Sequence, residues 1–351
     1  MNNLNSACNF QAKMKLTITT RRLELKHTWT IARGSADFKE YNYVALEHEG
    51  VTGHGEAAHN VRYGESLESI RAFLEASAQF LQPADPWNFY DLSKKIHAFG
   101  EGQYAAKAAL DMALLDWVAQ KLGVPLYRFW GLDQDKTPVT SYSIGIDRPE
   151  IMQEKIRGAA DFPILKIKLG GENDEAIMHA VREATDRIVR VDANEGWKDR
   201  QLALEKIYWL KELEVEFVEQ PMPAGRLDEV AWLRAHSPLP LIADEDVRTV
   251  KDIPGLVQAY DGINLKIMKA GGLQESLRMI HVARAHDLKI MLGCMIESAL
   301  GITAAAHLSP LADWADLDGN LLIKNDPYRG ATVAQGRLLL PEGPGLGVIA
   351  S

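Results

Sequence analysis

The sequence predicts an α/β protein in which an eight-stranded parallel barrel of the TIM type follows a smaller α+β domain. The chain has 351 residues, which suits a barrel of roughly 250 residues or fewer plus a second domain. In its second part, short apolar runs alternate with amphipathic stretches of helical periodicity. This alternation is typical of parallel β/α units. Eight such runs can be found, which is the number of strands in a TIM-type barrel.

The first part of the chain is expected to form the smaller domain. Residues 1–13 are polar and are expected to be a disordered tail. The alternating residues 15–20 predict a strand. The Ala- and Leu-rich stretch 105–120, which is closed by Gly123, predicts a helix. We therefore expect an α+β domain at residues 14–137.

The barrel is expected at residues 138–325. Its strands are predicted at the apolar runs 139–146, 164–169, 188–191, 215–218, 239–243, 262–267, 288–292 and, more weakly, 314–317. Between these runs, Ala203, Ile207 and Leu210 fall on one face of a predicted helix. The remaining residues, 326–351, contain several Pro and Gly and are expected to return to the first domain.

Composition and charge exclude several kinds of partner. Hydrophobic residues make up 46% of the chain and charged residues 25%, which is ordinary for a globular protein. The formal net charge of -9 does not suit a nucleic-acid binder. No apolar run reaches the ~18 residues that a membrane helix needs. The two cysteines, Cys8 and Cys294, cannot form a disulfide framework, so a cytoplasmic location is expected.

Polar side chains stand at the predicted carboxyl ends of the strands, where the catalytic residues of a closed barrel lie. Because strand side chains alternate in direction, Lys166 and Lys168 share a face, and so do Asp316 and Asp318. The intervening residues are apolar and suit the helix-covered outside of the barrel. The charged side chains then point into the barrel mouth. Burying them is costly unless they are paired or hold a metal.

Three carboxylates on successive strands predict a metal site. Asp192, Glu219 and Asp244 end the third, fourth and fifth predicted strands. Any one of them alone would more often be a helix cap, but their coincidence with lysines at neighbouring strand ends favours a shared site. Hard oxygen donors suit Mg²⁺, with one ion per subunit. No Cys/His cluster competes, so zinc is not expected.

Two lysines beside such a metal indicate proton abstraction next to a carboxylate. The metal stabilises the charge that develops on the carboxylate oxygens. Lys168 can act as a base if Lys166 or the metal lowers its pKa. Lys266, on the opposite wall, can return a proton to the other face of the carbon. One base on each face permits epimerisation, whereas a single base with an acid could serve elimination or cycloisomerisation.

The motifs at these strand ends resemble the enolase superfamily in its muconate-lactonising subgroup. They are Lys166-Ile167-Lys168, Val191-Asp192-Ala193-Asn194, Val218-Glu219-Gln220-Pro221, Ala243-Asp244-Glu245 and residues 264–272. The resemblance covers nearly everything from Met14 onward. It implies an α+β capping domain over a (β/α)7β barrel, Mg²⁺, and Lys168 and Lys266 as the two acid/base residues. Lys269 also belongs to the motif, but Lys266 is favoured because it follows Asn264 on the same strand face.

Within this subgroup, Asp316-Leu317-Asp318 resembles the Asp-x-Asp of dipeptide epimerases, in which the pair holds the ammonium of the substrate. Two carboxylates on one strand face agree with that role. The resemblance therefore implies an isomerase that inverts the α-carbon of the second residue of an Ala-X dipeptide by Mg-assisted two-base 1,1-proton transfer. It also implies a set of substrate-binding residues, which are Lys166, Ser143, Asp316, Asp318, Cys294, Met295, Ile296, Arg33 and Tyr63.

One position departs from the resemblance. Some Ala-Glu epimerases carry an arginine directly after the Arg-Gly-Ser run, where this chain has Ala36. Without it, an acidic second residue loses a partner that contributes about 1.5–3 kcal/mol, unless Arg33, Arg62 or Lys39 compensates. We therefore expect X to be small, apolar or polar. The alternatives are an L-Ala-D/L-Glu epimerase and a cycloisomerase or o-succinylbenzoate synthase of the same subgroup. A homo-oligomer and a role in cell-wall peptide metabolism are also expected.

Overall fold

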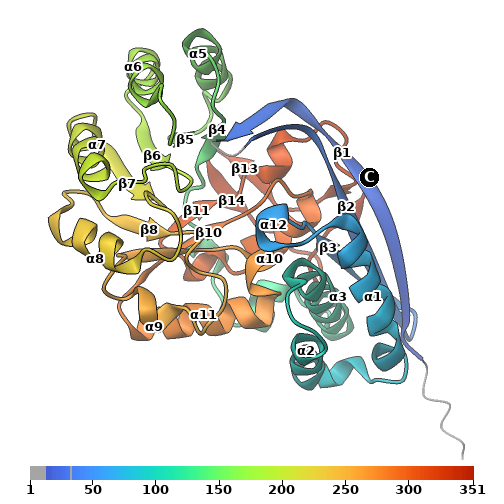
Figure 1. Ribbon diagram of the computed structural model, residues 1–351. Coiled ribbons are helices and arrows are strands. Elements are labelled where there is room, and N and C mark those ends of the chain that lie inside the picture. The colour runs from blue at the N-terminus through green and yellow to red at the C-terminus, as the bar shows by residue number, and fades with distance from the viewer. Residues whose placement is uncertain (1–12, 32–33) are drawn as a thin grey trace, which may run out of the picture.

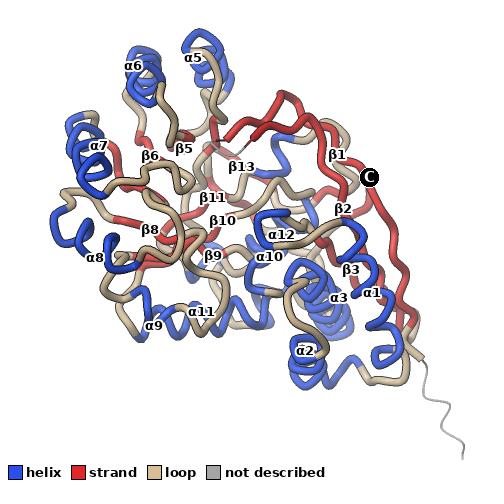
Figure 2. The backbone as a smooth tube through the Cα atoms, viewed as in Figure 1, coloured by secondary structure: helices blue, strands red, loops and turns tan. Residues whose placement is uncertain are grey.

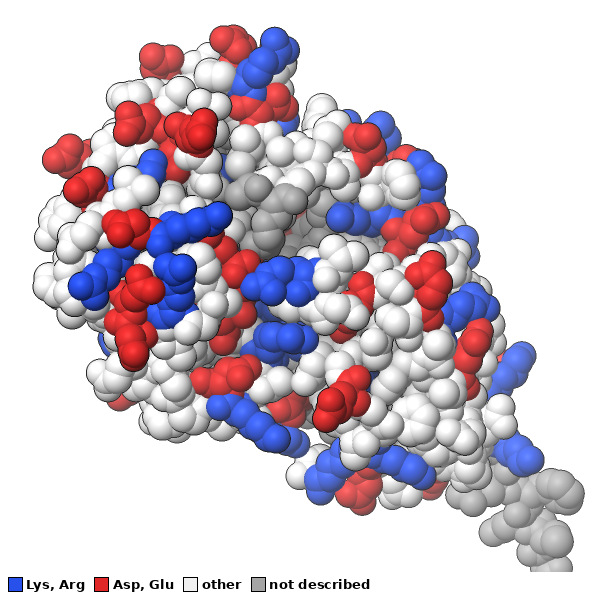
Figure 3. Space-filling view, viewed as in Figure 1, with Lys and Arg blue, Asp and Glu red and all other residues white. Residues whose placement is uncertain are grey.

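The computed structural model describes residues 13–31 and 34–351, which form a barrel and a smaller α+β unit beside it (Figure 1). Almost all of the predicted tail and the predicted substrate-binding residue Arg33 lie outside the described residues. Helices surround the barrel strands on the outside (Figure 2). Acidic and basic side chains are mixed on the face shown in Figure 3.

The first part of the chain folds as an antiparallel sheet with helices packed beside it. The three strands found in the described residues are β1 (Lys15–Ile31), β2 (Gly34–His48) and β3 (Val51–Ala57), in that order. The main helices are α1 (Leu67–Leu81), α2 (Phe89–Ala98) and α3 (Tyr104–Leu122), followed by the short α4 (Leu126–Phe129). The predicted strand and the predicted Ala- and Leu-rich helix are therefore confirmed. The exact domain boundaries stay a prediction.

Close packing of α3 on the sheet depends on two glycines of β3. A Cβ atom on Gly53 would lie 2.0 Å from the carbonyl oxygen of Ala113, and one on Gly55 would lie 1.9 Å from that of Ala109. Any larger residue would push the helix away. Residues 105–119 of α3 are buried on all sides, which is typical of a helix enclosed between two layers.

The second part of the chain is an eight-stranded parallel barrel. The strands are β4 (Tyr142–Ile144), β5 (Ile164–Lys168), β6 (Ile188–Asp192), β7 (Val215–Glu219), β8 (Leu241–Ala243), β9 (Gly262–Leu265), β10 (Lys289–Gly293) and β11 (Trp314–Asp316). Each strand pairs with its neighbour in the chain. A parallel bridge between Thr140 and Ala315 joins the two ends of the sheet. The predicted TIM-type barrel with an α+β domain is thus confirmed.

Helices connect the barrel strands and cover their outer face (Figure 1). They are α5 (Pro149–Gly158), α6 (Asp174–Ala184), α7 (Arg200–Glu212), α8 (Leu227–His236), α9 (Ile253–Leu256), α10 (Ile267–Ala270), α11 (Leu273–Ala285) and α12 (Ala299–Ala306). Ala203, Ile207 and Leu210 of α7 are fully buried, so the predicted apolar face is confirmed.

Several strands are shorter than the sequence predicts, and two of them show why. The run 139–146 is regular only at Tyr142–Ile144, because Val139 and Thr140 make isolated bridges instead. The run 262–267 ends at Leu265, because α10 begins two residues later. Lys266 therefore follows β9 rather than belonging to it, although its backbone is still extended, with φ -119° and ψ 125°.

The C-terminal segment contacts both parts of the molecule. It contains β12 (Tyr328–Arg329), β13 (Thr332–Ala334), β14 (Arg337–Leu339) and β15 (Ile349–Ala350). The backbone N–H of Leu126 donates to the carbonyl oxygen of Gly345 at 2.8 Å. The N–H of Leu346 donates to Asp116 Oδ1 of α3 at 2.7 Å. These bonds attach the end of the chain to the first domain.

His307, at the end of α12, joins three separate segments through its ring. Its Nδ1 accepts from the N–H of Tyr127 at 3.2 Å, so its Nε2, 3.1 Å from the carbonyl oxygen of Leu346, must carry the hydrogen. A second ring proton would break the first bond. Burial lowers the pKa of His307 from 6.5 to about 4. The unfolded chain therefore binds a proton over a pH range in which the folded chain does not.

We predict that replacing His307 with asparagine removes part of the acid sensitivity of the fold. The stability contributed by the neutral ring is complete above the unfolded pKa and is lost as the pH falls toward the folded value. At about pH 5 the loss amounts to about 2 kcal/mol. In urea titrations, the stability gap between wild type and His307→Asn should narrow by that amount from neutral pH to about pH 5. Parallel pH profiles of the two proteins would contradict this account.

Candidate active site

Three carboxylates converge at the carboxyl ends of successive barrel strands. Asp192 ends β6, Glu219 ends β7 and Asp244 directly follows β8. The parallel register pairs Asp192 with Glu219, so the side chains start side by side. One carboxylate oxygen from each of the three lies within 4.8 Å of the others. All three side chains are buried.

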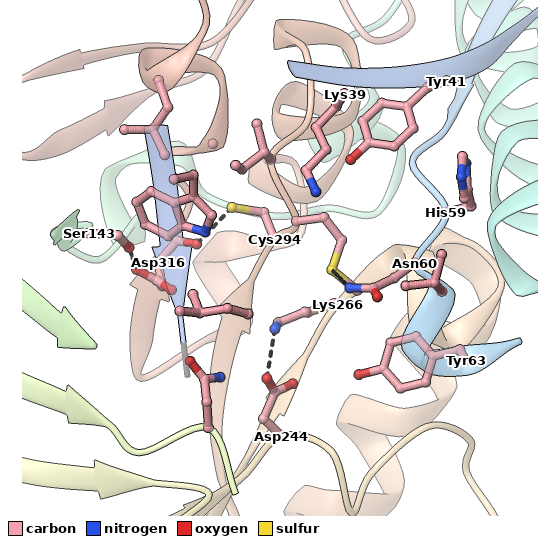
Figure 4. Close-up of a pocket in the computed structure, with 18 of the residues that line it drawn as sticks. Lys39, Tyr41, His59, Asn60, Tyr63, Ser143, Asp244, Lys266, Cys294 and Asp316 are labelled. Carbon is pink, nitrogen blue, oxygen red and sulfur yellow. Dashed lines mark hydrogen bonds and ion pairs between the residues drawn. The ribbon is translucent and has the colours of Figure 1, made fainter. Parts of the chain in front are cut away.

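Two lysines reach these carboxylates from opposite sides. Lys168 Nζ lies 2.6 Å from Asp192 Oδ2, and Lys266 Nζ lies 2.7 Å from Asp244 Oδ2 (Figure 4). The first lysine ends β5 and the second follows β9. These strands are four positions apart in the eight-stranded order, so they face one another across a closed barrel. Both lysines line the same cavity of about 380 Å³.

Lys166 connects the carboxylate cluster with the last barrel strand. Its Nζ lies 2.6 Å from Glu219 Oε2, 2.6 Å from Asp316 Oδ2 and 3.6 Å from Asp192 Oδ2. Only 1% of its side chain is exposed. A buried lysine with this set of partners acts mainly as a fixed positive charge. Its contact with the carboxylate cluster is as close as its contact with the predicted ammonium site.

The charges of the cluster control one another. Burial raises the pKa of Glu219 to about 7. The negative charge of Asp192 raises it further, and the positive charge of Lys166 acts in the opposite direction. Burial lowers the pKa of Lys266, but Asp244 and Glu219 more than compensate and hold it above its usual value. Burial likewise opposes ionisation of Asp244, but Lys266 and Lys269 keep its pKa well below the usual value. Without another cation, Asp244 and Glu219 therefore favour the protonated form of Lys266.

The donor set fits a hard divalent cation. Glu219 Oε1 accepts a hydrogen bond from Asn264 Nδ2 at 2.6 Å. Glu219 Oε2 accepts no hydrogen bond of good geometry from the described residues, although Lys166 Nζ lies near it. A buried carboxylate oxygen in this state is available to a ligand. Three converging carboxylates suit Mg²⁺, which keeps further positions for water and substrate oxygens.

A second acidic pair lies at the carboxyl end of the last barrel strand, in reach of the same Lys166 that contacts Glu219. Asp318 Oδ2 accepts from the N–H of Ser143 at 2.6 Å, and Asp316 Oδ1 accepts from Ser141 Oγ at 2.6 Å and Ser143 Oγ at 3.2 Å. Burial and the charge of Asp316 raise the pKa of Asp318 to about 7. A substrate ammonium at this place would relieve the repulsion between the two carboxylates.

The structure brings nearly all of the predicted site residues to this cavity. Those that line it are Lys166, Lys168, Lys266, Ser143, Asp244, Asp316, Asp318, Cys294, Met295, Ile296 and Tyr63. Cys294 Sγ donates to the carbonyl oxygen of Asp316 at 3.2 Å. Burial and nearby carboxylates raise the pKa of this thiol well above its usual value, so it does not suit a nucleophile.

Lys269 lies behind the cluster rather than in the cavity. Its Nζ donates to the backbone oxygen of Asp244 at 2.6 Å and also contacts Asp244 Oδ1. Unlike Lys266, it is not part of the cavity wall. The choice of Lys266 over Lys269 as the cavity-facing lysine therefore agrees with the geometry.

Sequence reasoning missed part of the wall that the α+β domain contributes. Tyr41 of β2 and His59 and Asn60, which follow β3, also line the cavity (Figure 4). Asn60 Nδ2 lies 3.7 Å from Met295 Sδ. Alternation along β2 could have indicated that residues 39 and 41 share a face, but not that this face covers the barrel mouth.

In the described part of the chain, no helix is long and apolar enough to cross a membrane.

Comparison with known proteins places this geometry in a family. Residues 13–131 match the family model described as mandelate racemase / muconate lactonizing enzyme, N-terminal domain. Residues 151–350 match the one described as enolase C-terminal domain-like. A relative from Bacteroides thetaiotaomicron, named L-Ala-D/L-Glu epimerase, is 44% identical over 96% of this chain and 88% of its own length.

Two solved structures share the complete fold. The substrate-liganded L-Ala-D/L-Glu epimerase from Bacillus subtilis has a TM-score of 0.92 and 30% identity, covering 96% of this chain and 99% of that one. The dipeptide epimerase from Enterococcus faecalis V583, in complex with Mg and L-Leu-L-Tyr, has a TM-score of 0.90 and 32% identity over 96% and 99%. The chain therefore belongs to the mandelate racemase / muconate lactonizing enzyme family of the enolase superfamily, as its strand-end motifs indicate.

Proposed function

We propose that this protein is a magnesium-dependent dipeptide epimerase, which inverts the α-carbon of the second residue of an Ala-X dipeptide. The observation that carries this proposal is the position of Lys168 and Lys266 on opposite walls of one cavity, each against a different carboxylate. A base on each face of a carbon is what inversion requires. The relatives named as dipeptide epimerases, one of them solved with Mg and a dipeptide, support it.

In this proposal, one lysine removes a proton from the substrate and the other lysine delivers one. The amine of one lysine takes the α-proton, the electron pair of the C–H bond moves toward the substrate carboxylate, and the ammonium of the other lysine delivers a proton to the opposite face. Asp192, Glu219 and Asp244 hold Mg²⁺, one per subunit. When bound there, Mg²⁺ supplies positive charge beside the substrate carboxylate and compensates the carboxylates that otherwise keep Lys266 protonated.

The acidic pair fixes the other end of the dipeptide. Asp316 and Asp318 receive the ammonium of the first residue, and Ser143 orients both carboxylates. Lys166 balances the charge between this site and the metal site. A cycloisomerase or succinylbenzoate synthase has no substrate ammonium to bind, so this second acidic pair favours the epimerase. The proposal also includes a cytoplasmic location, assembly as a homo-oligomer and a role in cell-wall peptide metabolism.

We predict that Ala-X dipeptides incubated with the protein and Mg²⁺ in D₂O gain one deuterium at the α-carbon of the second residue. N-acetylated dipeptides should exchange at least about 100-fold more slowly, because they lack the ammonium and leave the carboxylate pair without a partner. Mass spectrometry measures the exchange and chiral chromatography the inversion. No exchange with any dipeptide would refute the function, and equal rates with the acetylated substrates would refute the role of the acidic pair.

A further inference from the structure

Lys39 is a cation of the α+β domain that faces the cavity. It lies on β2, two residues before Tyr41, so both side chains leave the same face of the strand. Figure 4 shows the ammonium of Lys39 and the hydroxyl of Tyr41 turned into the cavity, with the ring of His59 beside them. All three line the cavity. None of these three residues has a part in the function proposed above.

The ammonium of Lys39 has no counter-ion in the described part of the protein. Burial lowers its pKa, and no carboxylate contributes to the shift. Burial and Lys39 also lower the pKa of His59, which keeps this neighbour neutral. Glu40 and Glu68 border the same cavity, but both are exposed and neither carboxylate contributes to the lowered pKa of Lys39. A partly desolvated cation of this kind gains free energy from an anionic ligand.

The chemistry of the proposed reaction assigns a direction to the substrate side chain. The α-carbon of the second residue carries a hydrogen, a carboxylate, an amide nitrogen and a side chain. The hydrogen must face Lys168 or Lys266, the carboxylate the metal ligands, and the amide the path to Asp316 and Asp318. The wall that remains belongs to the α+β domain, where Lys39 projects. The side chain of the second residue is therefore directed to the wall that contains Lys39, Tyr41 and His59.

We infer that Lys39 is a specificity-determining residue that binds an anionic side chain, of the glutamate or aspartate class, on the second residue of the dipeptide. This inference rests on the proposed function and deepens it. It also reverses the expectation that the second residue is not acidic, which was based on Ala36. The cation that is missing at position 36 is supplied by Lys39, which lies farther along the same strand. The partner is a carboxylate rather than a phosphate, because one ammonium flanked by a neutral ring and a hydroxyl suits a singly charged group.

The test compares L-Ala-L-Glu with its neutral isostere L-Ala-L-Gln. In wild type, kcat/KM should favour the glutamate dipeptide by about 10- to 100-fold, which is the range of one charge-assisted hydrogen bond. Lys39→Met should reduce this ratio toward one, mainly through the KM for L-Ala-L-Glu, and Lys39→Arg should restore most of it. Lys15→Met, a surface lysine of β1 paired with Glu47 at 3.6 Å, is the matched control and should retain the wild-type ratio.

The possible outcomes separate this inference from the function on which it rests. If neither dipeptide nor any other Ala-X exchanges its α-proton, the proposed function and the inference both fail. If the dipeptides are epimerised but the ratio is near one in wild type, or is the same in Lys39→Met, only the role of Lys39 is overturned. Lys39→Glu gives a further check, because it should favour the neutral dipeptide over the anionic one.

Discussion

Lys266→Ala is expected to lose at least about 1,000-fold in the rate of epimerisation, and Lys168→Ala is expected to lose as much. A positioned acid or base typically contributes 100- to 10,000-fold, roughly, and inversion needs both groups in the same turnover. Each variant should still bind Mg²⁺ and dipeptide. The measurement is the interconversion of the two epimers, followed by chiral chromatography.

Each lysine variant should also keep one half of the reaction. The remaining lysine can still remove and return a proton on its own face, so it should exchange the α-proton of one epimer with D₂O without inversion. Lys168→Ala and Lys266→Ala should therefore exchange opposite epimers. A structural defect would reduce both exchanges equally, which makes this pattern a specific sign of two bases. Exchange of the same epimer by both variants would contradict the two-base proposal.

Both variants are expected to fold because neither leaves a buried carboxylate unpaired. Without Lys168, Asp192 still has Lys166 at 3.6 Å. Without Lys266, Asp244 still contacts Lys269. Lys289→Ala is a suitable control, because this lysine opens β10 at the far end of the barrel and pairs with Asp313 at 3.4 Å. It should epimerise at the wild-type rate.

Asp244→Asn is expected to weaken Mg²⁺ binding by at least about 100-fold and to reduce turnover at saturating dipeptide. Changes to groups that only orient metal ligands already cost 10- to 100-fold, roughly, so loss of a ligand charge should cost at least as much. Asparagine keeps the shape of the side chain and one oxygen. Isothermal titration with Mg²⁺ measures the affinity, and removal of the metal with a chelator should abolish epimerisation reversibly.

The control for this change is a carboxylate at the opposite end of the same barrel. Asp261 precedes β9 and pairs with Arg234 at 2.9 Å, so Asp261→Asn removes a barrel charge without approaching the cluster. It should bind Mg²⁺ as wild type does. Unchanged Mg²⁺ affinity in Asp244→Asn would show that the metal lies elsewhere. A folded-state check by circular dichroism is needed, because Lys266 and Lys269 both lose a charged partner in this variant.

Much of the candidate site could be predicted because parallel strands bring their carboxyl ends to one edge of the sheet. Asp192, Glu219 and Asp244 follow three consecutive apolar runs, so their convergence needs only strand order and direction. The same reasoning placed Lys168 and Lys266 on facing walls, because their strands are half a barrel apart. The boundaries were less accurate, since the run at 262–267 contains both the end of β9 at Leu265 and the start of α10 at Ile267.

Contacts between elements distant in the chain could not be predicted in this way. Lys166 was expected to contact the substrate, but its ammonium lies equally close to Glu219 and Asp316. A buried ammonium needs nearby carboxylates to offset the free energy of its desolvation. Likewise, the sequence offered Lys39 only as one of three cations, with Arg33 and Arg62, and the packing of β2 beside the barrel places Lys39 in the cavity wall.

By itself, then, the sequence determined the fold class, the carboxylate cluster and the two opposed lysines, because local periodicity and strand order suffice to place them. Only the tertiary structure decided which domain surface closes the cavity and which cation faces the substrate side chain. These two features depend on how the α+β domain and the barrel pack together. The packing is set by the shapes and buried contacts of residues far apart in the chain, and no periodicity along a single segment records it.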